Sequence, residues 1–529
     1  MPAALPAGLH FNSYKEMNFK LICKIIGSLL FLESLFMILC LGISVWYHED
    51  DLFAFLISIL LTQATGFTMR CIGRNADNSL GRRESFLVVT LAWSIFSLFG
   101  ALPFMVGGYI TDFTNAYFES MSGFTTTGCT IIDDVECLPH GILFWRSLSQ
   151  WIGGLGIVFF TIAILPSMVG GSVKVFSAEA TGPIKTKLHP RLSSSAKSIW
   201  TIFLVLTIVC AGTFYALGMN IFDSVNHAMT TLATGGFSTH NASIEFYHSP
   251  AMEYCSTFFC FISGVNFILL YNAVIRGKVG NLFRNPEVKF YVIVIAIFTV
   301  FIMFELVLNN HYAYEHAFRC AIYQVVSFIT TTGLFNDDAG QWPHVTWVVL
   351  AVCMFMGGCA GSTSGGFKSI RCVMLLKIVR NEFRQMLHPR AVLPLRIGEN
   401  NVPIDKRVTL LAFLTIYCIM CIVCAFCMIA AGVDNTNAIT ITLSTLSNVG
   451  PTLGLEIGPT MSWNHLPDFA KWICSFLMLM GRLEIFSVLI ILKFFKHIFC
   501  KIFRLHNTFL FFLFYPLFFY CIKELFIKI

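Results

Sequence analysis

The chain has 529 residues, of which 56% are hydrophobic and only 12% are charged, and its formal net charge is +6. This composition is typical of a protein with many membrane spans and excludes a water-soluble globular protein. The sequence contains no phosphate loop, nucleophile elbow or pair of catalytic carboxylates, so it does not predict an enzyme. The cysteines and histidines are interpreted as buried thiols and isolated side chains, not as metal ligands.

Ten apolar stretches are long enough to cross a membrane, which takes about 20 residues. They are 18–46, 52–70, 86–109, 141–169, 197–219, 251–275, 288–308, 345–378, 407–432 and 468–495. The first stretch lacks a small-residue cleavage site, so we expect a retained helix. It contains Glu33, and because an acid is costly in apolar sequence we expect this side chain to be paired inside the protein.

A run of threonines closed by a glycine lies between the third and fourth stretches, at 122–130, and reads Ser-Gly-Phe-Thr-Thr-Thr-Gly-Cys-Thr. Threonine favours extended backbone, and glycine adopts angles closed to other residues. The run therefore suits an extended strand whose aligned carbonyl groups replace the water shell of a cation. A single run of this kind is more often a polar turn.

The run is repeated along the chain. Residues 328–335 read Phe-Ile-Thr-Thr-Thr-Gly-Leu-Phe, and looser copies occupy 232–237 and 446–451. Aligned on their last glycines, Gly128, Gly236, Gly333 and Gly450, the copies each have an apolar residue four positions earlier. The glycines are 108, 97 and 117 residues apart, which indicates a fourfold internal repeat.

Basic residues gather in alternate connections between the spans, which places these connections on the cytoplasmic side. They are Arg70, Arg74, Arg82 and Arg83; Lys174, Lys185, Lys187, Arg191 and Lys197; Arg276, Lys278, Arg284 and Lys289; and Arg371, Lys377, Arg380, Arg384, Arg390, Arg396, Lys406 and Arg407. The other connections carry the four threonine-glycine copies and nine acids, so we expect all four copies on the outer side. These acids either concentrate cations at a pore mouth or are ordinary loop charge.

Each copy follows a segment of roughly 10 to 15 residues, such as 115–124 and 437–446, that is too short to span but long enough for a half-helix. The predicted unit is therefore span, half-helix, extended strand, span. Four units around an axis would form a pore, with the negative ends of the half-helices directed at a central cation.

The eighth apolar stretch is interrupted at 357–366 by five glycines and three hydroxyl residues. A break inside lipid leaves amide groups unpaired, so this segment should face the pore; a close helix-packing surface is the alternative. Arg482 lies inside the tenth stretch, where an unsatisfied arginine costs at least ~3 kcal/mol. Glu484 is its local candidate partner.

Five motifs together resemble the Trk/Ktr/HKT superfamily of potassium transporters, most closely its TrkH-type members, over about residues 15–496. The motifs are Ser-Gly-Phe-Thr-Thr-Thr-Gly at 122–128, Ser-Gln-Trp-Ile-Gly-Gly-Leu-Gly-Ile at 149–157, Ala-Thr-Gly-Gly-Phe-Ser-Thr-His at 233–240, Gly-Gly-Cys-Ala-Gly-Ser-Thr-Ser-Gly-Gly at 357–366 and Gly-Arg-Leu-Glu-Ile-Phe at 481–486. The resemblance implies an all-α polytopic membrane protein with four pseudo-repeated units, each a helix, pore helix, filter and helix, around one pore. Two extra transmembrane helices would precede the units.

The resemblance also implies a potassium-binding filter and a gate. The filter residues would be Thr126, Thr127 and Gly128; Thr234, Gly235 and Gly236; Thr331, Thr332 and Gly333; and Asn448, Val449 and Gly450. The gate would be a loop formed by Gly357, Gly358, Gly361, Ser362, Thr363, Ser364, Gly365 and Gly366, with Arg482 against it. In related plant-type members a serine at the first filter glycine accompanies sodium preference, so Gly128 favours potassium.

The expected divisions of the chain are 1–83 (helix pair), 84–192, 193–285, 286–398 and 399–500 (repeats one to four, the gate loop in the third), and 501–529 (apolar tail). The resemblance implies a bacterial cytoplasmic (inner) membrane with the N-terminus in the cytoplasm. It also implies a homodimer on a cytosolic nucleotide-binding ring of the TrkA type. K⁺ would be the transported ion and membrane lipid would surround the chain; no covalent cofactor and no nucleic-acid partner is expected.

A second function stays open at this point. Broken helices also occur in secondary transporters, which couple Na⁺ or H⁺ to a substrate and rock two inverted halves around a midplane site. The four copies on one side of the membrane argue against inverted halves. The sequence does not decide between channel-like flow and symport with another ion.

Overall fold

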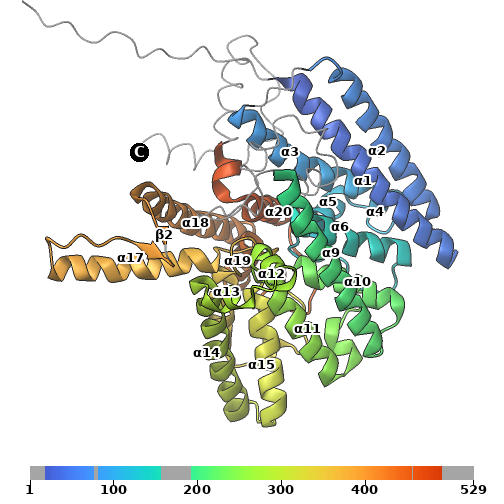
Figure 1. Cartoon of the computed structure of the whole chain (residues 1–529). Helices are drawn as coiled ribbons and strands as arrows, with labels where there is room; N and C mark the ends of the chain where they lie inside the picture. Colours follow the sequence, from blue (N-terminus) through green and yellow to red (C-terminus); the bar gives the residue numbers. More distant parts are fainter. Residues whose placement is uncertain (1–17, 77–80, 157–191, 399, 455–456, 491–529) are drawn as a thin grey trace, which may run out of the picture.

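The computed structural model describes residues 18–76, 81–156, 192–398, 400–454 and 457–490. The regular structure in these ranges is helical, except for a hairpin of two short strands, β1 (Arg396–Ile397) and β2 (Asn400–Asn401) (Figure 1). Six of the described helical segments are long and apolar enough to cross a membrane. The predicted all-helical membrane fold is confirmed.

The chain begins with two antiparallel helices, α1 (Phe19–Tyr47) and α2 (Leu52–Ile72), which lie side by side at one edge of the molecule (Figure 1). Glu33 on α1 is fully buried, and its carboxylate has no hydrogen-bond partner among the described residues. The expectation that Glu33 is paired is therefore wrong for this part of the chain. The sequence shows only that the acid is embedded in apolar residues, not what packs against it.

Four units of helices follow. The first has α3 (Arg82–Gly100), α4 (Leu102–Val106), α5 (Phe113–Phe124) and α6 (His140–Leu155); the second has α9 (Leu192–Ala216), α10 (Ile221–Ala233), η1 (Ser243–Tyr247), α11 (Pro250–Ser263) and α12 (Phe267–Val274). After α13 (Val279–Arg284), the third has α14 (Pro286–Asn309), α15 (Tyr314–Ile329), η2 (Ala339–Gln341), α16 (His344–Met356) and α17 (Ser369–Leu387). The fourth has α18 (Ile404–Ala430), α19 (Asn435–Ser447) and α20 (Asp468–Leu483).

Helices α5, α10, α15 and α19 are the short helices predicted before each threonine-glycine copy, and we call them the pore helices. Their starts are fixed locally, since Asp112, Asn220 and Asp434 accept backbone N–H groups of the first turn of α5, α10 and α19. Ala313 precedes α15 without such a cap. Each pore helix has 12 to 16 residues, too few to cross the membrane by itself.

The last helix of the second, third and fourth units is interrupted, which the sequence predicted only for the third unit. The expected continuous span 251–275 is wrong, because α11 and α12 meet at an angle of 107° after Gly264. Helix α6 ends at Leu155 before Gly156, with a φ of 88°, and α20 ends at Leu483 before Glu484, with a φ of 62°. The remainder of the predicted stretch 141–169, like the C-terminal tail 501–529, lies outside the described residues.

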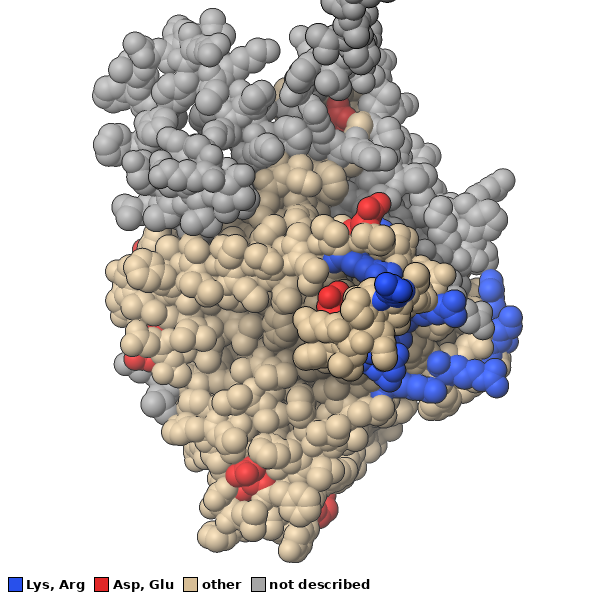
Figure 2. All heavy atoms as spheres, turned by 90° about the vertical axis from the view of Figure 1, so that its left-hand side faces the viewer, with Lys and Arg blue, Asp and Glu red and all other residues tan. Residues whose placement is uncertain are grey.

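Helix α17 extends away from the rest of the molecule as an arm (Figure 1). Its buried residues lie within its first six positions, Ser369–Met374, and Arg380 and Arg384 further along are exposed. Figure 2 shows Lys and Arg side chains gathered on this side of the molecule, while most of the described surface beside them carries no charge. The uncharged surface is what a lipid-facing protein requires.

Candidate functional site

The four pore helices end in the same way. The N–H groups of Thr127, Gly235, Thr332 and Val449 donate to the carbonyl oxygens five residues earlier, those of Ser122, Thr230, Ser327 and Ser444, at 2.9, 2.9, 2.8 and 2.9 Å. In each case the residue before the donor has a left-handed backbone, with φ between 53° and 57°. This is the hydrogen-bond pattern of a Schellman helix end, in which a left-handed residue reverses the chain.

The left-handed residues are Thr126, Thr234, Thr331 and Asn448, so the prediction of an extended strand is wrong at these positions. Closure of the helix end outweighs the extended preference of threonine. A β-branched residue in this conformation is unusual and costs about 1–3 kcal/mol, which packing around it must offset. Asn448 occupies the same position in the fourth copy, and asparagine tolerates this conformation better than threonine.

The last glycines of the four copies form a closed ring of contacts. A Cβ atom on Gly128 would overlap the carbonyl oxygen of Gly235, and one on Gly236 would overlap that of Thr332. In the same way, Gly333 lies against the carbonyl oxygen of Val449, and Gly450 against that of Thr127. Each copy thus touches the next, and the fourth touches the first. The structure brings all twelve predicted filter residues into this one ring.

The ring's carbonyl groups are largely unpaired. In each copy the first and third residues have a positive φ and the second does not. The backbone therefore alternates between left-handed and right-handed conformations, which turns successive N–H groups to one side and the carbonyl groups to the other. Of the twelve carbonyl groups, only that of Gly235 accepts a hydrogen bond from a described residue, the Gln150 side chain at 2.8 Å. Buried carbonyl groups need a partner. A dehydrated cation on the ring axis would supply one.

The predicted gate residues lie in a loop between α16 and α17, directly beneath the ring on the side of the pore helices' C-terminal ends. The Thr363 hydroxyl donates to the Leu232 carbonyl of α10 at 3.0 Å, and the Gly365 N–H donates to the Thr331 hydroxyl at 2.6 Å. Gly365 also lies against the Ser447 carbonyl of α19. Units two and four are opposite each other in the ring, so a loop that contacts both crosses under it.

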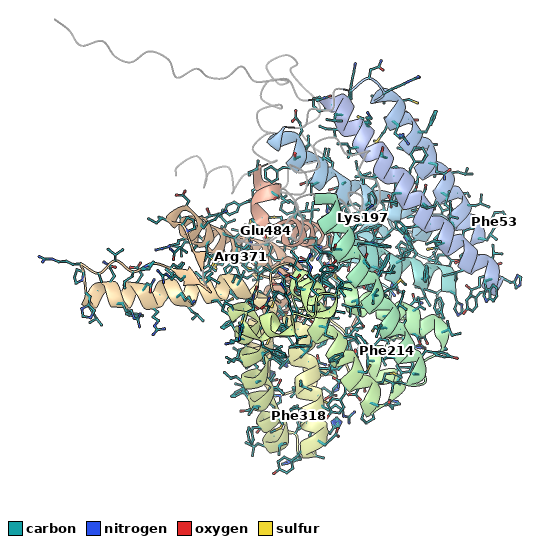
Figure 3. The ribbon with its side chains drawn as sticks, in the orientation of Figure 1. Phe53, Lys197, Phe214, Phe318, Arg371 and Glu484 are labelled. Atoms are coloured by element: carbon teal, nitrogen blue, oxygen red, sulfur yellow. The ribbon has the colours of Figure 1, made fainter. Side chains whose placement is uncertain are left out.

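Arg482 holds the middle of this loop. One guanidinium nitrogen donates to the Thr363 carbonyl at 2.7 Å, and another donates to the Gly154 carbonyl of α6 at 2.6 Å and to that of Gly153. Glu484, the local partner considered from the sequence, pairs with Arg371 of α17 at 2.6 Å. Figure 3 shows Arg371 and Glu484 close together where the arm leaves the body.

Two residues that the sequence did not single out anchor the base of the loop. The Glu287 carboxylate, at the start of α14, accepts the N–H groups of Ala360 at 2.6 Å and Ile370 at 3.2 Å, which lie on either side of the crossing segment. Asn266, at the α11–α12 bend, donates to the Ala360 carbonyl. Glu287 stands in a basic connection beside a proline, and this position gave no signal of a role at the loop.

Other side chains support the ring from behind. On α6, Gln150 both donates to the Gly235 carbonyl and accepts the Phe237 N–H at 3.1 Å. Glu253, expected among the outer loop charges, is instead buried on α11 and forms an ion pair with Arg319 of α15. The described residues hold no group of three His, Cys, Asp or Glu side chains placed to bind a metal.

The thiols are only partly as expected. Cys40, Cys129 and Cys474 are among the buried ones, whereas Cys71, Cys137 and Cys418 are exposed, so the interpretation of all thiols as buried is wrong. Cysteines recur at every third position from 418 to 427 along α18. None of the cysteines that the structure describes forms a disulfide.

A ring of four helix ends with largely unpaired carbonyl groups, and a loop that crosses beneath it, is the arrangement expected of a protein of the cation-transport class. A family profile described as TrkH, cation transport protein, matches residues 51–497. The chain therefore belongs to the TrkH family, as the motifs predicted.

Individual relatives agree. The chain is 38% identical over 477 residues to the Trk system potassium uptake protein TrkH of Halomonas elongata, covering 90% of this chain and 98% of that protein. It is 37% identical over 480 residues to the protein of the same name from Escherichia coli K12, covering 90% and 98%. The crystal structure of the potassium transporter TrkH from Vibrio parahaemolyticus matches with a TM-score of 0.81 and 34% identity, covering 90% of this chain and 99% of that one.

Proposed function

We propose that this protein takes up potassium through a single pore whose selectivity filter is the carbonyl ring of the four copies. The closed ring of glycine-to-carbonyl contacts carries the proposal, because it surrounds one axis with carbonyl groups of which all but that of Gly235 lack a hydrogen-bond partner among the described residues. Four pore helices also end at this ring, and their negative ends favour a cation there. Relatives over 90% of the chain are named as potassium uptake proteins.

Potassium is the proposed ion because each copy ends in glycine. With no Cβ atom, the four glycines let neighbouring backbones touch, which sets how many carbonyl groups surround the ion and at what spacing. A serine at Gly128 would displace the Gly235 carbonyl. The ion is transported and not a resident cofactor.

The loop 357–366 is proposed as the gate, with Arg482 as its closing residue. The guanidinium group adds a positive charge beneath the ring and hydrogen bonds that hold the loop across the axis. Opening would require these hydrogen bonds to break. A regulator that binds the open state of the loop more tightly than the closed state would shift the equilibrium toward opening.

We propose residence in a bacterial inner membrane with the N-terminus in the cytoplasm, following the positive-inside rule. The exposed arm of α17, with Arg380 and Arg384, and Arg390 just beyond it, is proposed to dock a cytosolic nucleotide-binding ring beneath a homodimer. Reversing these three charges should weaken ring capture without changing ion preference. Reversing the exposed Arg276, Lys278 and Arg284 is the matched control, and undiminished capture by the first variant would exclude this docking surface.

The direct test of the function is ion flux in liposomes that contain the purified protein, with potassium and sodium gradients imposed separately. Passive, potassium-selective flux without any second ion gradient is expected. Flux that requires a Na⁺ or H⁺ gradient would instead favour the alternative, a coupled transporter. The same measurement decides between channel-like flow and symport. Equal flux of both cations would exclude a selective filter.

A further inference from the structure

Behind the ring lies a buried ion pair to which nothing above assigns a role. Glu119 on α5 is 1% exposed and Arg146 on α6 is 2% exposed, and Arg146 Nε donates to Glu119 Oε1 at 2.9 Å. Removing two charges from water is costly, and an apolar pair of similar size often packs as well. The presence of a buried ion pair here is therefore explained by the groups to which its two charged side chains bind.

Glu119 holds the segment that leaves the first filter copy. Both of its carboxylate oxygens accept the Thr130 hydroxyl at 3.0 Å, and Oε2 accepts the Ile131 N–H at 3.0 Å. Thr130 stands only two residues after Gly128. The position of that glycine is thus fixed from one side by the pore helix and from the other by Glu119.

Arg146 extends the same restraint to the second copy. It donates to the Ser238 carbonyl and to the Thr130 hydroxyl, both at 3.2 Å, and its guanidinium carbon lies 4.2 Å from the centre of the Phe237 ring. Ser238 and Phe237 directly follow Gly236. One ion pair therefore restrains the outer ends of two neighbouring copies at the point where Gly128 meets the second copy.

The corresponding position in the other units shows how specific this arrangement is. Nine residues before the last glycine stand Glu119, His227, Gln324 and Ile441. His227 lies 3.3 Å from the Ser238 hydroxyl, and Gln324 donates to the Asp337 carbonyl at 2.9 Å, so each of these contacts stays within its own unit. Ile441 has no polar side chain. Of these four residues, Glu119 alone takes part in an ion pair that reaches the next unit.

We propose that Glu119 and Arg146 are positioning residues that set the cation selectivity of the filter by holding the first and second copies at a fixed separation. Selectivity between potassium and sodium depends on the number and placement of coordinating carbonyl groups, and loosening two adjacent copies would let the ring close around a smaller ion. The inference rests on the proposed filter.

The test measures the potassium-to-sodium permeability ratio in liposomes for Glu119→Gln and for the double variant Glu119→Leu/Arg146→Met. The single variant keeps the size of the side chain but leaves Arg146 without its charged partner. The double variant leaves no orphaned charge and should melt close to the parent temperature. In both, the ratio should fall at least fivefold. Glu49→Gln is the matched control, because Glu49 pairs with His140 at the far end of α6, and its ratio should equal that of the parent.

Gly333→Ser, in the third copy and away from the pair, is measured in parallel. If it lowers the ratio while the folded double variant keeps the parent ratio, the pair only stabilises the protein and the inference is wrong although the filter stands. If neither Gly333→Ser nor the double variant changes the ratio, the filter proposal fails and the inference fails with it. A lowered ratio in both, with the double variant stable, supports positioning.

Discussion

The carbonyl ring and the loop 357–366, the proposed gate, lie in direct contact but are held in different ways. The ring takes the same backbone motif from all four units, with matching hydrogen bonds and matching left-handed residues. The loop comes from the third unit alone and is held by side chains, namely Arg482 of the fourth unit, Asn266 of the second unit and Glu287 of its own unit.

This difference indicates how one pore can be selective and still open. A backbone ring made of four equal parts has no part that moves without disturbing its neighbours, because each glycine touches the next copy. A loop held by a few side chains can be released without changing the ring above it. Variants of the loop should therefore change the rate of flux, and variants of the ring should change ion preference.

The largest expected effect is on the loop. Arg482→Ala removes hydrogen bonds from a charged group, each with a net contribution of about 1.5–3 kcal/mol, so resting potassium flux should rise at least tenfold. Flux into liposomes without any regulator measures this, with Ser475→Ala on the same helix as control. Shortening the loop within 361–366 should act in the same direction. If both folded variants conduct no faster than the parent, the loop is packing and the gate lies elsewhere.

Next in size is the effect of the ring on ion preference. Gly128→Ser and Gly333→Ser place a side chain where the neighbouring carbonyl lies, at a φ of 88° and 77°. We expect the potassium-to-sodium permeability ratio to fall about tenfold, since carbonyl placement sets selectivity. Gly212→Ser on α9, where a Cβ atom meets open space, is the control. Unchanged ratios in both variants would remove the filter assignment.

Glu287→Gln should have a smaller effect on the loop. A glutamine keeps one acceptor oxygen but loses the charge that holds two N–H groups, so the loop base is weakened by about 1 kcal/mol. Resting flux should rise roughly three- to fivefold, with an unchanged permeability ratio. Glu305→Gln, at the other end of the same helix, is the control. A changed ratio without a changed rate would contradict the division between ring and loop.

The smallest effect concerns the outer side of the ring. Burial alone would lower the pKa of His240, but its hydrogen bonds to Asp223 and Glu136, each at 3.2 Å, outweigh burial and raise that pKa above its usual value. A raised pKa in the folded protein stabilises it below about pH 6.5, and this contribution is lost as the pH rises through the raised pKa. His240→Asn should flatten the dependence of melting temperature on pH in that window, whereas the exposed His248→Asn should not. An unchanged slope in His240→Asn would show that this contact does not contribute.

Much of the fold could be predicted from the sequence because it depends on local pattern. Apolar length predicted the six described helices that are long enough to cross a membrane, and the recurrence of threonine and glycine predicted four units of one kind. The short segments before the copies predicted the pore helices to within a few residues, as α5 and α19 show. The resemblance of five motifs gave the family.

The backbone conformation of the copies was decided by the ends of the pore helices and by the packing of each copy against the next, not by residue preference. Thr126 prefers an extended conformation, but the end of α5 requires a left-handed residue there, and the Ser122 carbonyl takes the Thr127 N–H. The bend after Gly264 is likewise set by packing, since the Gly264 carbonyl accepts the Cys359 N–H of the gate loop, 95 residues later in the chain.

The sequence by itself therefore determined what each segment is, a span, a half-helix or a break, because these follow from the composition of about 20 neighbouring residues. Only the tertiary structure decided which segments meet. Glu119 with Arg146, Glu287 with Ala360 and Arg482 with Thr363 are 27, 73 and 119 residues apart. Their hydrogen bonds depend on how helix ends converge on the axis, and no local periodicity carries that geometry.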